Sequence, residues 1–449
     1  MPVVRLIAEN IGPFERVDID FSDGSGRPHP GPHILAGVNG SGKSTLLRAI
    51  AWAMSWPDYG FQEDEWRHFL RGPKSRALVQ VTRDGGLFSS YAATADTEPG
   101  WWGPLREWWK SLDLPGECHV VQPDHSSLDL SGEDIVVKKF PLAIRAYAAT
   151  RALSYVGTPG KMEALGSPTD HCLGFESTIQ NQAIQRWLVD LFSRKALAKE
   201  RGQEFETYEQ TLNRFQDALK LVCGDESVYA DVDLGPMEPR LYFRGNRLNF
   251  SQLSDGMRST VGWLADFMMR RDQDGGKPGL LLLDEVDIYL HPRWQRILLP
   301  AVRKALPDVQ IIGSSHSPFV ISSCSDARIH VLTLDEHGVA HAQSPQDAPF
   351  GESVTATLID IFGVESRFDV ETERDLKTWD ALKRAEATRK LTPDEKRQLD
   401  ALSQELSDRS EELRLIVNPA RRLPASLLNA LETQTGRKGQ RARRKVKLA

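Results

Sequence analysis

The amino-acid sequence predicts an α/β fold built around a parallel sheet. Near the N-terminus, an apolar stretch at 34–36 leads into a glycine-rich loop and then into a helical pattern over 46–54. Much later in the chain, residues 279–312 read as strand, helix and strand, and the first of these strands is four consecutive leucines. An all-aliphatic strand is typical of a parallel sheet covered on both faces, and strand–helix alternation is typical of α/β folds.

Composition excludes several classes of protein. The chain has 449 residues, is 40% hydrophobic and 26% charged, and carries a formal charge of −6, so it is not polybasic throughout. No aliphatic run approaches the roughly 20 residues of a membrane span. Cys118, Cys172, Cys223 and Cys324 are scattered without a C-x-x-C pair, which indicates neither a zinc site nor a disulfide framework. We expect a soluble, cytoplasmic protein with no membrane partner.

The remaining elements follow from local patterns. Residues 3–7 and 17–21 predict strands, as does 78–81, and the stretch from 177 to 222 is helical, with an apolar stripe that faces the core. Residues 85–132 predict an irregular surface insertion. Its four tryptophans indicate local packing or, as an alternative, a partner-binding patch. The stripe and the tryptophans are Phe205, Tyr208, Leu212, Phe215, Leu219 and Val222, and Trp101, Trp102, Trp108 and Trp109.

The glycine-rich loop carries the strongest motif. Gly37-x-x-x-x-Gly42-Lys43-Ser44 matches the phosphate-binding loop, in which glycines let backbone N–H groups point at phosphate oxygens. Lys43 is expected to reach the β- and γ-phosphates and Ser44 to ligate Mg²⁺. A flexible Gly/Ser turn is the alternative, and the strand before and helix after the loop disfavour it. The candidate nucleotide-binding residues are Gly37, Asn39, Gly40, Ser41, Gly42, Lys43, Ser44 and Thr45.

The leucine strand ends in Asp284 and Glu285. Because ligands of open α/β sheets gather at the carboxyl ends of the strands, both acids are candidates for the same site as the phosphate loop. Asp284 is predicted to hold Mg²⁺, directly or through water. Glu285 is predicted to activate or orient the attacking water.

Two weaker motifs accompany these. Leu253-Ser254-Asp255-Gly256-Met257-Arg258 resembles the LSxGxR signature of ATP-binding-cassette ATPases, and we refer to it as the signature segment. It would present the Ser254 hydroxyl and backbone N–H groups near Gly256 to a γ-phosphate, although an ordinary serine N-cap is the alternative. Gly313-Ser314-Ser315-His316-Ser317-Pro318, after the strand at 309–312, resembles the switch-histidine motif of the same ATPases. The resemblance implies that His316 contacts the γ-phosphate; a structural histidine is the alternative.

Taken together, the four motifs resemble the ATP-binding-cassette ATPases of the chromosome-maintenance, double-strand-break-repair and OLD type. The sequence DEVDIYLHP at 284–292 is similar to their DE-x-x-x-x-LHP motif, and residues 6–14 are similar to their first strand and turn. Residues 69–72 resemble the segment after their glutamine loop, which makes Gln62 a candidate third metal ligand. The resemblance implies a homodimer that sandwiches two ATP molecules head to tail, with Ser254 and Gly256 acting in trans and Asp287 near the interface. A higher assembly of such chains is the alternative.

Departures from the family narrow this interpretation. The segment between Thr45 and Leu253 is too long for a transporter subunit and too short and irregular for a long coiled coil. After residue 330 there is no D-x-D pair of the kind a Toprim nuclease needs, so nuclease activity is not expected. The chain resembles the ATPases of the Septu, PARIS and retron antiphage systems, which implies a separate effector protein, a nuclease or toxin, as partner.

The sequence thus predicts a P-loop ATPase of the ABC type with a helical insertion and a mostly helical C-terminal region. Its expected activity is slow, Mg²⁺-dependent ATP hydrolysis coupled to dimer closure. A DNA-clamping repair ATPase, with nucleic acid bound by the basic tail, and a nucleotide-gated scaffold remain alternatives. The expected segments are a first ATPase lobe at 1–165, a helical insertion at 166–245, a second ATPase lobe at 246–345, a helical region at 346–436 and a disordered basic tail at 437–449.

Overall fold

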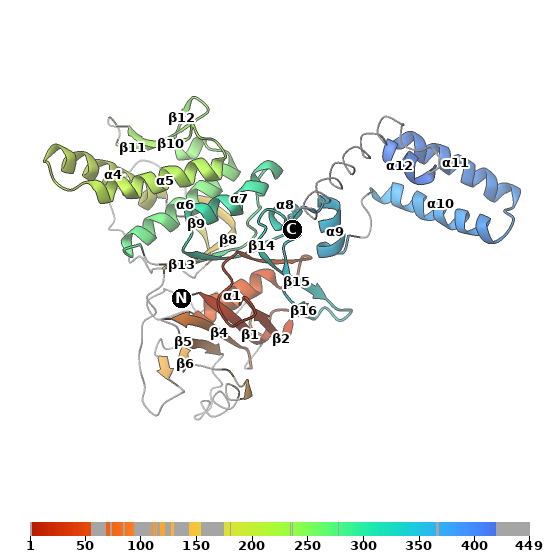
Figure 1. The fold of residues 1–449 in the computed structure, drawn as a ribbon, viewed down its shortest axis with the longest axis horizontal. Coiled ribbons are helices and arrows are strands. Elements are labelled where there is room, and N and C mark those ends of the chain that lie inside the picture. Colours follow the sequence, from red (N-terminus) through yellow and green to blue (C-terminus); the bar gives the residue numbers. More distant parts are fainter. Residues whose placement is uncertain are drawn as a thin grey trace, which may run out of the picture. The chain divides into compact units, whose positions relative to one another are not determined.

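The chain divides into two compact units, Met1–Gly363 and Val364–Ala449, each of which is described by itself (Figure 1). The predicted boundaries at 165, 245 and 345 stay predictions, as does the tail at 437–449, which lies outside the described residues. The computed structural model describes residues 2–54, 69–71, 74–83, 86–93, 108, 111–112, 114, 117–121, 127–129, 143–153, 175–179, 181–233, 235, 237–276, 278–364 and 368–418.

A mainly parallel sheet forms the centre of the first unit, with strand order β16-β15-β3-β14-β13-β8-β9 and β17 paired to β15. The strands from β15 to β9 run parallel, while β16 and β17 are antiparallel additions. The strands are β3 (His33–Gly37), β8 (Ala143–Leu153), β9 (Glu176–Ile179), β13 (Gly279–Leu283), β14 (Val309–Ser315), β15 (Arg328–Leu334), β16 (Ala340–Ala342) and β17 (Gln346–Asp347).

Both faces of this sheet are buried, as the leucine strand predicts. Leu281 and Leu283 belong to the core on one face, and Leu280 and Leu282 to the core on the other. Figure 1 shows α4 to α7 on the first face and α1, with a second sheet, on the opposite face. The α/β fold is therefore confirmed, with three layers. The helices are α1 (Lys43–Met54), α4 (Asn181–Glu200), α5 (Glu206–Cys223), α6 (Asp255–Gln273), α7 (Pro292–Ala305), α8 (Pro318–Ile321) and α9 (Val354–Phe362).

The second sheet has the order β2-β1-β4-β5-β6-β7. The prediction of an irregular insertion at 85–132 is wrong in part, because β5 pairs with β4 along its whole length. Its sequence, GLFSSYAA, shows little alternation. The strand therefore forms because it pairs with the edge of β4, and its own sequence has little strand propensity. The strands are β1 (Val3–Ile11), β2 (Phe14–Asp20), β4 (Arg76–Arg83), β5 (Gly86–Ala93), β6 (Glu117–Val121) and β7 (Ser127–Asp129).

Trp108 packs on this second sheet rather than within a self-contained insertion. Its indole N–H donates to Glu9 Oε1 at 2.9 Å, and the guanidinium of Arg76 lies 4.2 Å from its ring centroid. Only 6% of the residue is exposed. The other three tryptophans of this segment lie outside the described residues.

The helical prediction for 177–222 is correct for most of that range. Residues up to Ile179 form β9, and the helical part is broken between α4 and α5. The stripe is confirmed as core-facing in α5, where Leu212, Phe215, Leu219 and Val222 are buried. A small antiparallel sheet, β10 (Tyr229–Asp233), β11 (Glu238–Phe243) and β12 (Asn246–Leu248), then leads toward α6.

Helix α6 is tied to the central sheet by buried polar contacts. The Tyr147 hydroxyl, from β8, donates to Asp266 Oδ2 at 2.7 Å, and Arg270 Nε donates to the other carboxylate oxygen at 3.1 Å. These three residues are 8% exposed or less. Burial and the Asp266 carboxylate raise the pKa of Tyr147 well above its usual value, so its hydroxyl keeps its proton. The contact fixes α6 against a strand that neighbours β13.

The second unit is helical in its described part, as predicted. It contains α10 (Val370–Thr388), α11 (Pro393–Arg409) and α12 (Glu411–Val417). The capping box predicted at the start of α11 is present, with Thr392 and Glu395 bonded reciprocally. Leu406, Leu413 and Val417 form a small core against Trp379. None of the helices in the described ranges has the length and hydropathy that a membrane crossing requires.

A pair of buried histidines lies where β3 and β15 begin. His33 Nδ1 and His330 Nε2 are 3.1 Å apart, and both rings pack against Phe21. Burial lowers the pKa of His330 to about 3 and holds the pKa of His33 well below its usual value. Both imidazoles are therefore neutral in the folded chain near pH 7.

This pair predicts a loss of stability in mild acid. The unfolded histidines take up protons near pH 6.5 while the folded ones do not, so the free energy of unfolding falls as the pH drops from 6.5 toward 3. Between pH 6.5 and 5, we expect His330→Gln to lose about 2 kcal/mol less than the unsubstituted chain, measured by urea denaturation. His337→Gln, at an exposed position, is the control; parallel curves for all three proteins would contradict the account.

Candidate nucleotide-binding site

The glycine-rich loop runs from the end of β3 to the start of α1, in the predicted order of strand, loop and helix. Gly37, Gly40 and Gly42 all have φ between +81° and +151°, a region that favours glycine. A Cβ on Gly37 would lie 2.3 Å from the Leu332 carbonyl oxygen, and one on Gly42 would lie 2.2 Å from the Phe14 ring. Gly40 has no neighbour within 4 Å. Two of the three glycines are thus fixed by close packing as well as by conformation.

The Lys43 side chain folds back over this loop. Its ammonium donates to the carbonyl oxygens of Gly37 at 3.0 Å and Val38 at 2.9 Å. Burial lowers the pKa of Lys43, and the negative charges of Asp284, Glu285 and Asp287 oppose that shift. The cation therefore sits between the loop and a group of carboxylates.

The other predicted loop residues take distinct positions. Asn39 is exposed, as is Gly40, whereas Ser41 is buried and its backbone N–H donates to the Val38 carbonyl at 3.2 Å. Thr45 lies against the turn between β1 and β2, where a Cβ on Gly12 would come within 2.7 Å of its methyl group. The turn after β1 thus packs against the start of α1, directly after the loop.

Asp284 meets the phosphate loop directly. Ser44 Oγ donates to Asp284 Oδ1 at 2.9 Å, although 240 positions separate these residues in the chain. Asp284 is 4% exposed, and its backbone N–H donates to the Tyr147 carbonyl on β8. The structure therefore brings together the two residues predicted to share a metal ion.

Glu285 follows in a left-handed backbone conformation, with φ at +44°. Its carboxylate is half-buried, and its backbone N–H donates to the Ser314 hydroxyl at 2.7 Å. The turn at Glu285 carries the chain away from the sheet directly after Asp284. Both acids consequently lie at the carboxyl edge of the parallel strands, where the phosphate loop also lies.

Sequence reasoning missed a set of hydrogen-bonding residues around these acids. Ser314 Oγ donates to Asp284 Oδ1 at 2.6 Å, and Ser315 Oγ donates to Asp287 Oδ1 at 2.6 Å. Gln295, on α7, donates to the Leu290 carbonyl at 2.9 Å. The serines before His316 were visible in the sequence, but only the pairing of β14 with β13 shows which acids they contact.

The signature segment begins α6 as predicted, with Ser254 at the N-cap position. Its hydroxyl makes no capping hydrogen bond, and the residue is exposed. Gly256 is buried against the loop after β13, because a Cβ there would lie 2.4 Å from the Tyr289 carbonyl oxygen. Tyr289 itself is 59% exposed and has φ at +62°. Within the part of the chain that the structure describes, no hydrogen bond joins Ser254 or Gly256 to the phosphate loop.

His316 follows β14 and is half-buried. Burial and the nearby Lys43 cation lower its pKa, while Asp284, Glu285 and Asp287 oppose the shift. The imidazole therefore lies within the electrostatic reach of the phosphate loop and the acids. Gln62, the remaining candidate ligand, lies outside the described residues.

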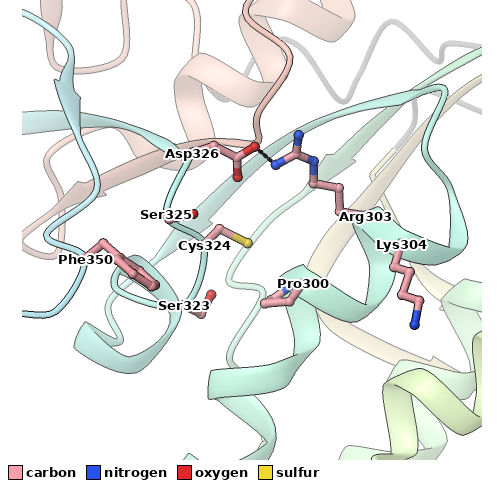
Figure 2. A pocket seen from close by; sticks show the side chains of 8 residues that line it. All are labelled: Pro300, Arg303, Lys304, Ser323, Cys324, Ser325, Asp326 and Phe350. Atoms are coloured by element: carbon pink, nitrogen blue, oxygen red, sulfur yellow. Dashed lines mark ion pairs between the residues drawn. The ribbon is translucent and has the colours of Figure 1, made fainter. Parts of the chain in front are cut away.

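A cavity of about 400 Å³ lies at the opposite edge of the sheet and is separate from this site. Figure 2 shows Arg303, on α7, paired with Asp326, and Phe350 lining another part of the cavity. Residues 323–326 precede β15, so the cavity is at the amino ends of the strands. None of the predicted nucleotide-binding residues lines it.

Two family models match the chain on either side of the insertion. An AAA domain model matches residues 5–83, and a model described as "AAA domain, putative AbiEii toxin, Type IV TA system" matches residues 238–322. These ranges contain the phosphate loop in one case and the signature, both acids and His316 in the other. These two parts of the chain are similar to AAA domains.

Known proteins that are similar in sequence point to the same kind of domain. Septu protein PtuA of Bacillus thuringiensis is 21% identical, over 81% of this chain and 84% of the relative. A PtuA of Bacillus mycoides is 24% identical over 77% of this chain, which spans 42% of that longer protein. Retron Ec83 probable ATPase of Escherichia coli is 26% identical over 74% of this chain and 71% of the relative. The chain resembles the ATPases of the Septu and retron antiphage systems.

Among solved structures, the SMC head domain from Thermotoga maritima matches 77% of this chain and 99% of that one, at 14% identity and a TM-score of 0.40. The relatives and family models, together with the three-layer fold and its phosphate loop, confirm the predicted resemblance to ABC-type P-loop ATPases of defence systems.

The phosphate loop yields a steric prediction with a matched control. Gly42→Ala places a methyl group against Phe14 and should destabilise the chain by about 1–3 kcal/mol and weaken ATP binding, because the loop must move. Gly40→Ala meets no neighbour and should cost about 1 kcal/mol of backbone strain. Thermal melting and ATP titration measure both effects; equal losses in the two variants would contradict the assigned packing.

Proposed function

We propose that this chain binds Mg²⁺–ATP between its phosphate loop and Asp284 and hydrolyses it slowly to ADP and phosphate. The contact between Ser44 and Asp284 carries the proposal, because it joins the ends of the two motifs that such a site requires. Their meeting places a hydroxyl and a carboxylate beside a loop whose backbone N–H groups suit phosphate oxygens.

The donor set fits the metal. Ser44 Oγ and Asp284 Oδ1 are hard oxygen donors of the kind that Mg²⁺ prefers, and we assign the ion to them, with Gln62 as a further candidate ligand. When bound, Mg²⁺ neutralises charge on the phosphates. Lys43 is held close by, and its cation would pair with the β- and γ-phosphate oxygens once it leaves the loop carbonyls.

Glu285 is assigned as the residue that orients and deprotonates the attacking water. The hydrogen bond from its backbone N–H to the Ser314 hydroxyl fixes the backbone of Glu285 directly after Asp284, and the residue is only partly exposed. His316, whose lowered pKa favours the neutral imidazole near pH 7, would donate a hydrogen bond to the terminal phosphate. Removing either side chain should affect hydrolysis more than binding.

We further propose that two copies close head to tail, with Ser254 and Gly256 of one copy on the nucleotide of the other. Ser254 supports this, because it is exposed and its hydroxyl makes no capping hydrogen bond, so it can reach a nucleotide held by another copy. Such closure is the self-complementary contact of a twofold dimer. Slow turnover then follows, because each site is complete only in the closed dimer.

The proposed role is the regulatory ATPase of an antiphage system that controls a separate effector nuclease or toxin. Similarity to Septu protein PtuA and the retron ATPases supports it. In the described part of the chain, no group of three or more His, Cys, Asp or Glu residues is arranged to hold a metal ion.

Two variants test the ATPase assignment. Glu285→Gln should keep ATP affinity and lose hydrolysis by at least about a hundredfold, because only the general base is removed. Lys43→Ala should lose binding itself, because it removes the phosphate-pairing cation. Phosphate release and equilibrium ATP titration separate these effects; full turnover in Glu285→Gln would remove Glu285 as the base.

Mixed dimers test the shared site. Ser254→Arg and Lys43→Ala chains are each expected to be inactive, but mixed in equal amounts they should recover about a quarter of the original turnover. Half of the dimers would then be mixed, and each would hold one intact site of two. Hydrolysis that stays at the level of the separate variants would contradict closure in trans.

A further inference from the structure

Ser314 lies between the two acids of the site and makes a hydrogen bond toward each. Its hydroxyl donates to Asp284 Oδ1 at 2.6 Å and accepts from the backbone N–H of Glu285 at 2.7 Å. Its carbonyl accepts from the N–H of Val286 at 2.9 Å. The residue is 0% exposed. One residue on β14 thus fixes three consecutive residues, 284–286, of the loop that follows β13.

Strand register explains this position. Leu283 pairs with Gly313 in the parallel ladder, so the next residues on each strand, Asp284 and Ser314, face each other beyond its end. A Cβ on Gly313 would lie 2.8 Å from the Val286 side chain. The glycine therefore leaves room for the loop to turn over β14, and the following serine meets that loop with a hydroxyl.

The neighbouring serine serves a different segment. Ser315 Oγ donates to Asp287 Oδ1 and accepts from the Ser317 N–H at 3.0 Å. Ser317 Oγ in turn donates to Gln295 Oε1 at 2.7 Å, and Gln295 donates to the carbonyls of Asp287 and Leu290. The two adjacent serines thus hold different parts of the loop after β13. Ser314 bonds to Asp284 and Glu285, and Ser315 helps to hold residues 287–290, which end beside the signature segment.

We propose that Ser314 is a positioning residue for the binding of Mg²⁺–ATP. Its hydrogen bonds orient the Asp284 carboxylate and hold Glu285 in its left-handed turn. This inference rests on the proposed function. A hydroxyl bonded to a carboxylate at this distance is a short, charge-assisted hydrogen bond, of the strong kind. Ser44 donates to the same oxygen, so the bond from Ser314 still holds the Asp284 carboxylate when Ser44 turns to the metal.

The test compares binding of a non-hydrolysable ATP analogue in Mg²⁺ and in EDTA. The ratio of the two affinities reports the metal site without any turnover. Ser314→Ala should reduce this ratio about tenfold. The affinity in EDTA should stay unchanged, because the hydrogen bonds of the Ser314 hydroxyl within the described residues go to Asp284 and Glu285 rather than to the phosphate loop. Ser322→Ala is the control, since it removes the same hydroxyl group at a position whose hydrogen bond goes to the backbone carbonyl of Pro318, outside the site.

The outcomes separate the two claims. An unchanged ratio in Ser314→Ala overturns the role of Ser314, provided that the unsubstituted chain gains affinity from Mg²⁺. If the unsubstituted chain gains none, the metal assignment of the proposed function itself fails. Thermal melting checks folding, and Ser314→Cys, which keeps the size of the side chain with a weaker donor, replaces the alanine variant if that one unfolds.

Discussion

The hydrogen bond from Ser44 to Asp284 joins two residues 240 positions apart, and the rest of the site depends on that approach. Strand order makes it possible: β3, which leads into the phosphate loop, and β13, which ends at the acids, are separated by β14 alone. Of the segments between them in sequence, α4 and α5 lie on one face of the central sheet, and β4 to β7 belong to the second sheet on the other face. The parallel sheet therefore acts as a frame that holds two distant segments in contact.

β14, the strand between them, also contributes residues that contact the acids. β14 carries Gly313, which leaves room for the turn after β13, and then two buried serines that bond to the acids beyond it. On the far side of β13, the backbone of Tyr147 accepts from Asp284 while its hydroxyl bonds to Asp266 on the signature helix. Asp284 is thereby linked through hydrogen bonds to the phosphate loop, to β14 and, through one tyrosine, to α6. Under the proposed closure of two copies, a displacement of α6 would change the contacts of Tyr147, whose backbone carbonyl accepts from Asp284.

Features encoded in short segments could be predicted from the sequence. The phosphate loop with its helix, the leucine strand, the α5 stripe and the capping box at Thr392 each depend on residues a few positions apart. Their partners in space were not available to that reasoning. β5 has little alternation and is formed by pairing with β4, and Trp108 finds its partner in Glu9 on β1. Ser314 was visible beside His316, but its role depends on the register between β13 and β14.

The central claim is that Ser44 and Asp284 act on one metal ion together. A double-mutant cycle tests it most directly, with Mg²⁺-dependent ATP affinity measured for Ser44→Ala, Asp284→Ala and the combination. The account predicts strong non-additivity: each single variant loses most of the gain in affinity that Mg²⁺ provides, and the double variant loses no more. Losses that add in the double variant would show two independent contributions and contradict a shared site.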